Sequence, residues 1–117
     1  MSQVIEQRAL ELVQDDKPEE FNRYVASLSV PVNLSGAQFR GYDLRKFNLK
    51  TANLSNVYLK NSDIRGLDLS KANLAGASMR DAKMSGCLFP ESISAEEIRL
   101  SFELGTRLRC SQYSKHA

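Results

Sequence analysis

Apolar residues recur at every fifth position over about half of this chain. Twelve consecutive steps are filled without a gap, by Leu34, Phe39, Leu44, Leu49, Leu54, Leu59, Ile64, Leu69, Leu74, Met79, Met84 and Phe89. An α-helix repeats its buried face every ~3.6 residues and a β-strand every ~2 residues, so neither element explains this period. A short unit repeated at a fixed period is typical of a solenoid. We expect the twelve residues to form its structural core.

A second apolar or small residue lies two positions before each member of this series, from Val32 to Cys87. Two inward positions with one outward position between them are the alternation of a β-strand, but only for three residues. The position two residues after a member of the series holds five of the six glycines, and in three further pentamers Asn56, Asn61 and Asp81. Gly and Asn tolerate positive φ, so each pentamer is predicted to be a short extended segment followed by a bend.

A longer period of twenty residues is superimposed on the pentamers. The sequence "VNLSGA" begins at residue 32, "ANLSNV" at 52 and "ANLAGA" at 72. Four pentamers in each turn of the solenoid would place these matches above one another. The same stacking predicts a column of amides at Asn33, Asn53 and Asn73, whose side chains can hydrogen-bond along the stack.

Units such as "ANLSN", "LDLSK" and "ANLAG" resemble those of the pentapeptide repeat protein family, over about residues 32–91. The resemblance implies an all-β solenoid, a right-handed quadrilateral β-helix of about three coils. Lys83 and Leu88 depart from the family pattern at a position that is usually polar, and Met79, Met84 and Phe89 depart from it in the five-residue series. The third coil is therefore predicted to be the least regular.

The flanking segments are predicted to be short α-helices that cap the ends of the solenoid, since the ends expose strand edges and core side chains. We expect an N-terminal helical cap at 1–31, the β-helix at 32–91, and a C-terminal helix and tail at 92–117, together forming one structural domain. Within the first flank, amphipathic patterns predict helices over residues 3–14 and 18–28.

The last helix has clear boundary signals. Ser94 with Glu97 three residues later is typical of a helix start, and Gly105 of a helix end. Ile98 and Phe102 are predicted to be its buried pair. As an alternative to capping, this helix could dock a partner or form a homodimer.

The sequence contains no motif typical of catalysis, metal binding or cofactor binding. The single histidine, His116, lies next to the C-terminus. Cys87 occupies an inward position and Cys110 lies in the tail, and both are expected to be reduced thiols. We therefore expect no catalytic residues, no metal site, no cofactor and no enzymatic activity.

Charged residues form two further predicted columns on the outside. Arg40, Lys60 and Arg80 make one, and Arg45 and Arg65 begin another beside Asp43 and Asp63. The repeats hold nine basic and five acidic residues, a net charge of +4. The columns are interpreted as a solvated face or, alternatively, as a basic stripe for an acidic partner or a phosphate backbone.

These observations favour a non-enzymatic protein–protein interaction or scaffold module with a protein partner. A binder of nucleic acid or another anionic surface through Arg40, Lys60 and Arg80 is the alternative. The resemblance also suggests a DNA-mimicking gyrase modulator, but a net charge of +4 over three coils disfavours it. No apolar run approaches the ~20 residues that span a bilayer, and the first residues carry acids instead of a secretory signal, which predicts a cytoplasmic protein without membrane insertion.

Overall fold

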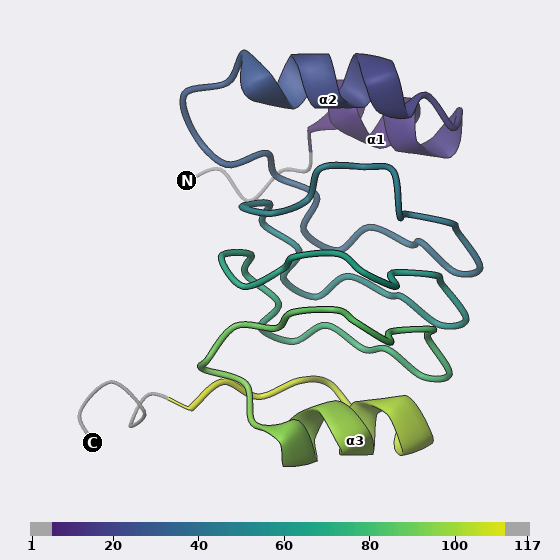
Figure 1. Ribbon diagram of the computed structural model, residues 1–117, viewed down its shortest axis with the longest axis vertical. Coiled ribbons are helices and arrows are strands. Elements are labelled where there is room, and N and C mark those ends of the chain that lie inside the picture. The colour runs from purple at the N-terminus through teal and green to yellow at the C-terminus, as the bar shows by residue number, and fades with distance from the viewer. Residues whose placement is uncertain (1–5, 112–117) are drawn as a thin grey trace.

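The computed structural model describes residues 6–111, in which three short helices flank a stack of coils (Figure 1). The helices are α1 (Gln7–Gln14), α2 (Pro18–Ala26) and α3 (Ala95–Leu104). Helices α1 and α2 cover one end of the stack and α3 covers the other. The helices that were predicted in the two flanks are therefore present, although residues 3–5 of the first lie outside the described residues and α2 ends at Ala26.

The coils are held together by parallel pairing between residues twenty positions apart. Asn33 pairs with Asn53, and Asn53 with Asn73. The Leu54 N–H donates to the Asn73 carbonyl at 2.8 Å, while the Asn73 N–H donates to the Ala52 carbonyl at 3.0 Å. The bridges are Asn33–Asn53, Gln38–Tyr58, Asp43–Asp63, Asn53–Asn73, Tyr58–Ser78, Asp63–Lys83 and Asp68–Leu88. One turn of the stack therefore takes four pentamers, as the twenty-residue period predicted.

Each turn is called a coil, and each pentamer in it contributes one side. Coil 1 spans residues 32–49, coil 2 residues 52–69 and coil 3 residues 72–89. In coil 3, side 1 is 72–74, side 2 is 77–79, side 3 is 82–84 and side 4 is 87–89. The corresponding side of coil 2 lies twenty residues earlier in the sequence, and that of coil 1 forty residues earlier.

The expected all-β class is present only in part. Over the described residues every bridge is isolated, and the helices are the only regular elements. The reason is geometric: a bend follows each set of three extended residues before a second bridge can form on the same side. Parallel pairing between successive coils is thus present, whereas residues 6–111 contain no continuous strand or sheet.

The bends adopt the left-handed conformation at the predicted positions. Positive φ values occur at Gly36, Gly41, Asn56, Asn61, Gly66, Gly76, Asp81 and Gly86. Their φ angles lie between 59° and 79°. Since this region is sterically unfavourable for most L-residues, the choice of Gly, Asn or Asp at this position shapes the coil.

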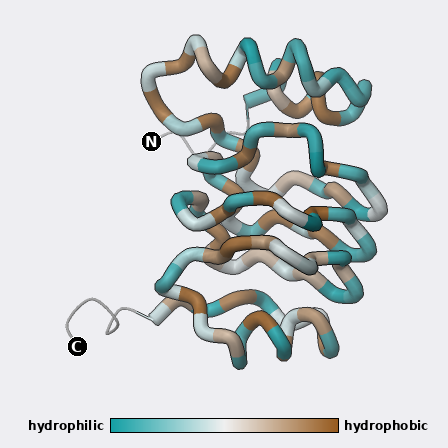
Figure 2. The backbone as a smooth tube through the Cα atoms, viewed as in Figure 1, coloured by the Kyte–Doolittle hydropathy of each residue, from teal (hydrophilic) through white to brown (hydrophobic). Residues whose placement is uncertain are grey.

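The core runs along the axis of the stack. Ten of the twelve residues of the five-residue series are buried, whereas Met84 and Phe89 in coil 3 are half-buried. Figure 2 shows hydrophobic positions interleaved with hydrophilic ones along each coil. Ser62 is the exception on the inside, because it is fully buried and its hydroxyl makes no hydrogen bond within the described residues.

At the N-terminal end, where no further coil precedes coil 1 in the described residues, side-chain and backbone groups of the helical flank contact coil 1. Phe21 of α2 packs edge-to-face on Phe47, with ring centroids 5.3 Å apart. The Asn48 N–H donates to Asn22 Oδ1 at 2.7 Å. The Glu6 N–H donates to the Asn33 carbonyl at 2.8 Å. These long-range bonds satisfy backbone groups that coil 1 would otherwise leave open.

At the C-terminal end, α3 has the predicted boundaries. Ser94 Oγ accepts from the Glu97 N–H at 3.1 Å, and Gly105 ends the helix with φ 76°. The Glu97 carboxylate then accepts from the Arg109 N–H at 3.0 Å, which ties the following segment to the helix. The guanidinium of Arg109 also lowers the pKa of Glu97.

The predicted burial of Phe102 is wrong. Phe102 is 39% exposed, whereas Ser101 is fully buried and Ile98 is half-buried against the core. The face of α3 that meets coil 3 runs through residues 98 and 101, because the Ser101 hydroxyl accepts the Met79 N–H. Leu108, beyond the helix, supplies the second buried apolar side chain instead.

Candidate interaction surfaces

The column of Arg45 and Arg65 is neutralised by its neighbours. Arg45 Nε donates to Asp43 Oδ1 at 2.9 Å, and Arg65 Nε donates to Asp63 Oδ1 at the same distance. Arg45 also lies 3.3 Å from Asp63 in the next coil. Hydrogen bonds from the Arg45 guanidinium hold the pKa of Asp43 well below its usual range, and those from Arg65 lower that of Asp63. These two arginines are therefore engaged in a network of alternating charges.

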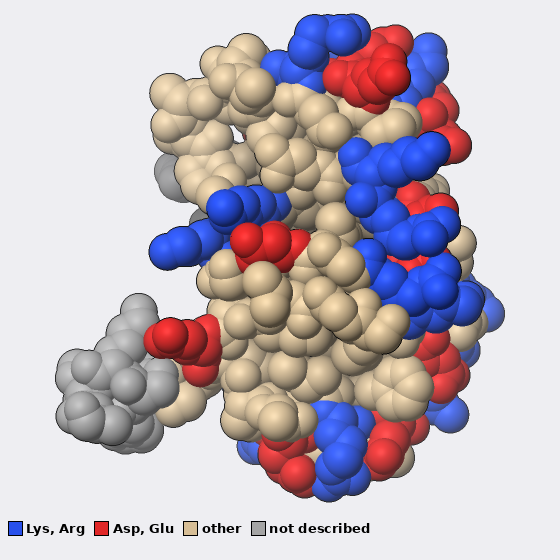
Figure 3. All heavy atoms as spheres, in the orientation of Figure 1, with Lys and Arg blue, Asp and Glu red and all other residues tan. Residues whose placement is uncertain are grey.

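The column of Arg40, Lys60 and Arg80 carries more available charge. The Gly41 N–H donates to the Lys60 carbonyl and the Asn61 N–H to the Arg80 carbonyl, so the three residues stack. Arg80 lies 3.8 Å from Asp81, while within residues 6–111 neither Arg40 nor Lys60 pairs with a carboxylate. Figure 3 shows basic side chains gathered along one flank of the coils, with acidic ones between them.

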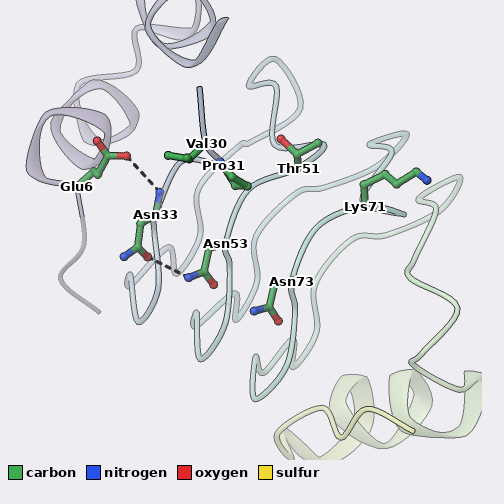
Figure 4. A pocket seen from close by; sticks show the side chains of 8 residues that line it. All are labelled: Glu6, Val30, Pro31, Asn33, Thr51, Asn53, Lys71 and Asn73. Atoms are coloured by element: carbon green, nitrogen blue, oxygen red, sulfur yellow. Dashed lines mark hydrogen bonds between the residues drawn. The ribbon is translucent and has the colours of Figure 1, made fainter. Parts of the chain in front are cut away.

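Side 1 carries the asparagine column along an open cleft of about 540 Å³ (Figure 4). Asn53 Nδ2 donates to Asn33 Oδ1 at 3.3 Å. Each of the three amide oxygens also accepts the backbone N–H two residues later, at 3.0–3.1 Å. The column is thus explained by its structural role in fixing the bends. The cleft is lined by Glu6, Val30, Pro31, Asn33, Thr51, Asn53, Lys71 and Asn73.

The reactive residue types do not converge on a site. Cys87 is half-buried, and burial raises the pKa of its thiol to about 11. Cys110 is exposed, near Glu97 and Arg109. His116 lies outside the described residues. Over residues 6–111, no group of three or more His, Cys, Asp or Glu side chains is placed to hold a metal ion.

Most of the exposed large apolar side chains belong to the C-terminal part of the described residues. In the described part of the chain, four large apolar residues are exposed: Val30 (65%), Leu88 (57%), Phe102 (39%) and Leu104 (62%). Three of them belong to coil 3 or α3. Leu88 takes a position held by Asn48 and Asp68 in the coils above, so its outward side chain breaks an otherwise polar column. The sequence pattern identified Leu88 as irregular but gave no signal for Leu104.

The architecture defines a repeat protein whose unit is five residues, with inward aliphatics, outward polar columns and helical ends. The family model for pentapeptide repeats matches residues 33–66 and 52–89, with eight copies. The chain therefore belongs to the pentapeptide repeat family, as its sequence predicted. No curated protein and no solved structure matches the chain.

Helices in the described residues are too short and too polar to cross a lipid bilayer. The longest, α3, has ten residues and includes three glutamates and an arginine.

Proposed function

We propose that this chain is a non-enzymatic protein-interaction module, a right-handed quadrilateral β-helix whose C-terminal end binds a protein partner. The observation that carries the proposal is the placement of Leu88, Phe102 and Leu104, all exposed and all on coil 3 or α3. Exposed large apolar side chains at one end of the stack are candidate binding groups, because burying them against a partner is favourable.

The remainder of the repeat surface supports the same view. Its outward positions are polar columns, many of them tied to neighbouring backbone or to an opposite charge. A stack in which many outer groups are already paired is suited to presenting one end to a partner. The apolar end supplies a free-energy gain on burial that the polar sides do not, at about 25 cal/mol per Å² of apolar surface.

The test compares two surface variants in affinity purification from the cells that express the protein. Phe102→Glu with Leu104→Glu should abolish retention of a specific protein that the wild type retains. Val30→Glu is the matched control, because Val30 is as exposed as Leu104 but precedes coil 1. If all three chains retain the same proteins, the C-terminal end is not the binding surface.

Self-association through α3 is a distinct form of this proposal. Light scattering on the full chain decides it, since a homodimer doubles the molar mass of 13.1 kDa. Phe102→Glu with Leu104→Glu should then restore the monomer, whereas Val30→Glu should not. A wild-type monomer at all concentrations would leave only a different protein as the partner.

A second candidate function is binding to nucleic acid or another anionic surface. It is favoured by the stacked Arg40, Lys60 and Arg80, of which the first two form no ion pair in the described residues. A gel shift at several salt concentrations tests it, because phosphate binding weakens steeply with salt. Binding that survives Arg40→Glu with Arg80→Glu unchanged would exclude this column as the site.

A further inference from the structure

Coil 3 has backbone donors that the coils above it use for stacking. In coil 2, the N–H groups of Ile64, Gly66 and Leu69 donate to the Lys83, Ser85 and Leu88 carbonyls at 2.8–3.0 Å. The equivalent donors one coil later are Met84, Gly86 and Phe89. Within residues 6–111 these three N–H groups have no acceptor. Sides 3 and 4 of coil 3 therefore present an open backbone edge.

Acceptors alternate with these donors along the same edge. The Ser62 carbonyl accepts the Lys83 N–H at 2.8 Å, and the Leu67 carbonyl accepts the Leu88 N–H at 2.9 Å. The equivalent carbonyls in coil 3 are those of Ala82 and Cys87, which accept no N–H from the described residues. An edge with donors and acceptors in this order is the template on which another extended chain can pair.

On side 2 of the same coil, another segment of the chain pairs with the corresponding backbone edge. There the chain supplies its own extended segment, in which the Leu108 carbonyl accepts the Gly76 N–H and the Leu108 N–H donates to the Ala77 carbonyl, both at 2.8 Å. The Leu108 side chain is buried by this pairing. An added segment is therefore compatible with α3 on side 2, and residues 6–111 supply no such segment for sides 3 and 4.

Side chains along the open edge favour a particular kind of segment. Met84, Cys87 and Phe89 are only half-buried, and Leu88 is exposed, so apolar side chains would complete their burial. Lys83 takes the column position of Asp43 and Asp63 but forms no ion pair in the described part of the chain. An acidic side chain in the added segment would lie beside it.

We propose that the edge at residues 82–89 binds an extended peptide segment of a partner protein by strand addition. This inference rests on the proposed interaction function and names the chemistry of the partner. The segment carries two apolar residues five positions apart, a bend between them and an acidic residue opposite Lys83. Backbone hydrogen bonds supply affinity in this mode, while alternate side chains supply specificity.

The probe is a capped synthetic peptide with the sequence of residues 61–70, "NSDIRGLDLS". In the chain this segment pairs with side 3 of coil 1, where Asp63 bridges to Asp43, and its first aspartate would meet Lys83. The matched control peptide has the same side chains but is N-methylated at both aspartates, which removes the N–H groups that would reach the Ala82 and Cys87 carbonyls.

Binding to the full-length protein is followed by amide exchange and chemical shifts in NMR. The peptide should slow exchange at Met84, Gly86 and Phe89, and N-methylation should weaken its binding about tenfold or more. Leu88→Lys should weaken binding as well, whereas Val30→Lys should not. Equal binding of both peptides, or no protection of these three amides at millimolar peptide, would overturn the proposal.

Two other outcomes would also overturn it. Shift changes confined to Phe102 and Leu104 would place the peptide on α3. Protection of Met84, Gly86 and Phe89 that grows with protein concentration in the absence of peptide would make a second copy the occupant. In both cases the affinity purification with Phe102→Glu and Leu104→Glu still tests the proposed interaction function independently.

Discussion

The hydroxyl of Ser101 accepts a hydrogen bond from the Met79 N–H at 2.9 Å, and both residues are fully buried. A side chain of α3 thus takes the place that a backbone carbonyl of a fourth coil would occupy on side 2. This contact and the hydrogen bond from the Asp81 N–H to the Phe102 carbonyl at 3.1 Å set the rotation of the helix against the repeats, which leaves the Phe102 side chain exposed.

Ser101→Ala should therefore destabilise the protein by about 1–3 kcal/mol, because it leaves the buried Met79 N–H without an acceptor. Chemical denaturation measures the change in the free energy of unfolding. Ser85→Ala is the control, since Ser85 is exposed, and should change stability by less than about 0.5 kcal/mol. Equal effects of the two substitutions would show that the contact contributes nothing.

Ser62→Ala should increase the free energy of unfolding, which is the opposite of the effect expected for Ser101→Ala. The Ser62 hydroxyl is buried without a hydrogen bond in the described residues, and Ala82 occupies the equivalent position in coil 3. Removing an unsatisfied hydroxyl should stabilise the protein by about 1 kcal/mol. Ser35→Ala should instead be destabilising, because Ser35 Oγ lies 2.9 Å from Ser55 Oγ. A loss of stability in Ser62→Ala would contradict this description of the core.

The bend at Asn61 requires positive φ, which is 61° here. Asn61→Ala should cost about 1 kcal/mol, because a Cβ without a compensating polar group is strained in this region. Asn61→Gly should stay within about 0.5 kcal/mol of the wild type, since glycine adopts the same angle freely. The two melting temperatures test the prediction, and a more stable alanine variant would refute it.

Acid should weaken the stack on side 3. The pKa values of Asp43 and Asp63 are lowered in the folded state by their arginine partners, so the unfolded chain takes up these protons first as pH falls. This contribution to stability is complete above about pH 4, the usual pKa of aspartate, and is lost as pH falls through the lower folded values. Asp63→Asn should flatten the decline in melting temperature below pH 4, whereas Glu91→Gln, at an exposed position, should leave it unchanged.

The two thiols should differ in reactivity. Burial raises the pKa of Cys87 to about 11, so about 0.1% of it is thiolate at pH 8. Cys110 is exposed. Iodoacetamide should therefore label Cys110 much faster, as mass spectrometry of the wild type and of Cys110→Ser would show. Fast labelling in Cys110→Ser would mean that Cys87 is more open than the structure indicates.

The repeat pattern predicted the coils well because its information is local. Within five positions, each pentamer contains both the residue type that points inward and the residue type that forms the bend. The positive φ of Asn56 or Gly66 could therefore be expected from sequence alone. The boundaries of α3 followed in the same way from Ser94 and Gly105. The all-β class was confirmed only in part, since three extended residues on a side permit only one bridge.

The ends could not be predicted, because their contacts join residues far apart in sequence. Asn22 bonds to residues 46 and 48, and Leu108 pairs with residues 76 and 77. Neither lies in the five-residue period, and a helical pattern alone does not reveal which of Ser101 and Phe102 faces the coil. The candidate surface depends on these contacts, so the sequence predicted exposed strand edges at the ends but not which sides of coil 3 stay open.

Amide hydrogen exchange in the free, full-length protein at low concentration tests the central claim most directly. Ile64, Gly66 and Leu69 donate to coil 3, whereas Met84, Gly86 and Phe89 occupy the same positions on the open edge. We predict that the first three amides exchange at least about tenfold more slowly than the last three, because hydrogen-bonded amides exchange only on local opening. Equal protection of both sets would show that the edge is closed and would contradict a binding end at coil 3.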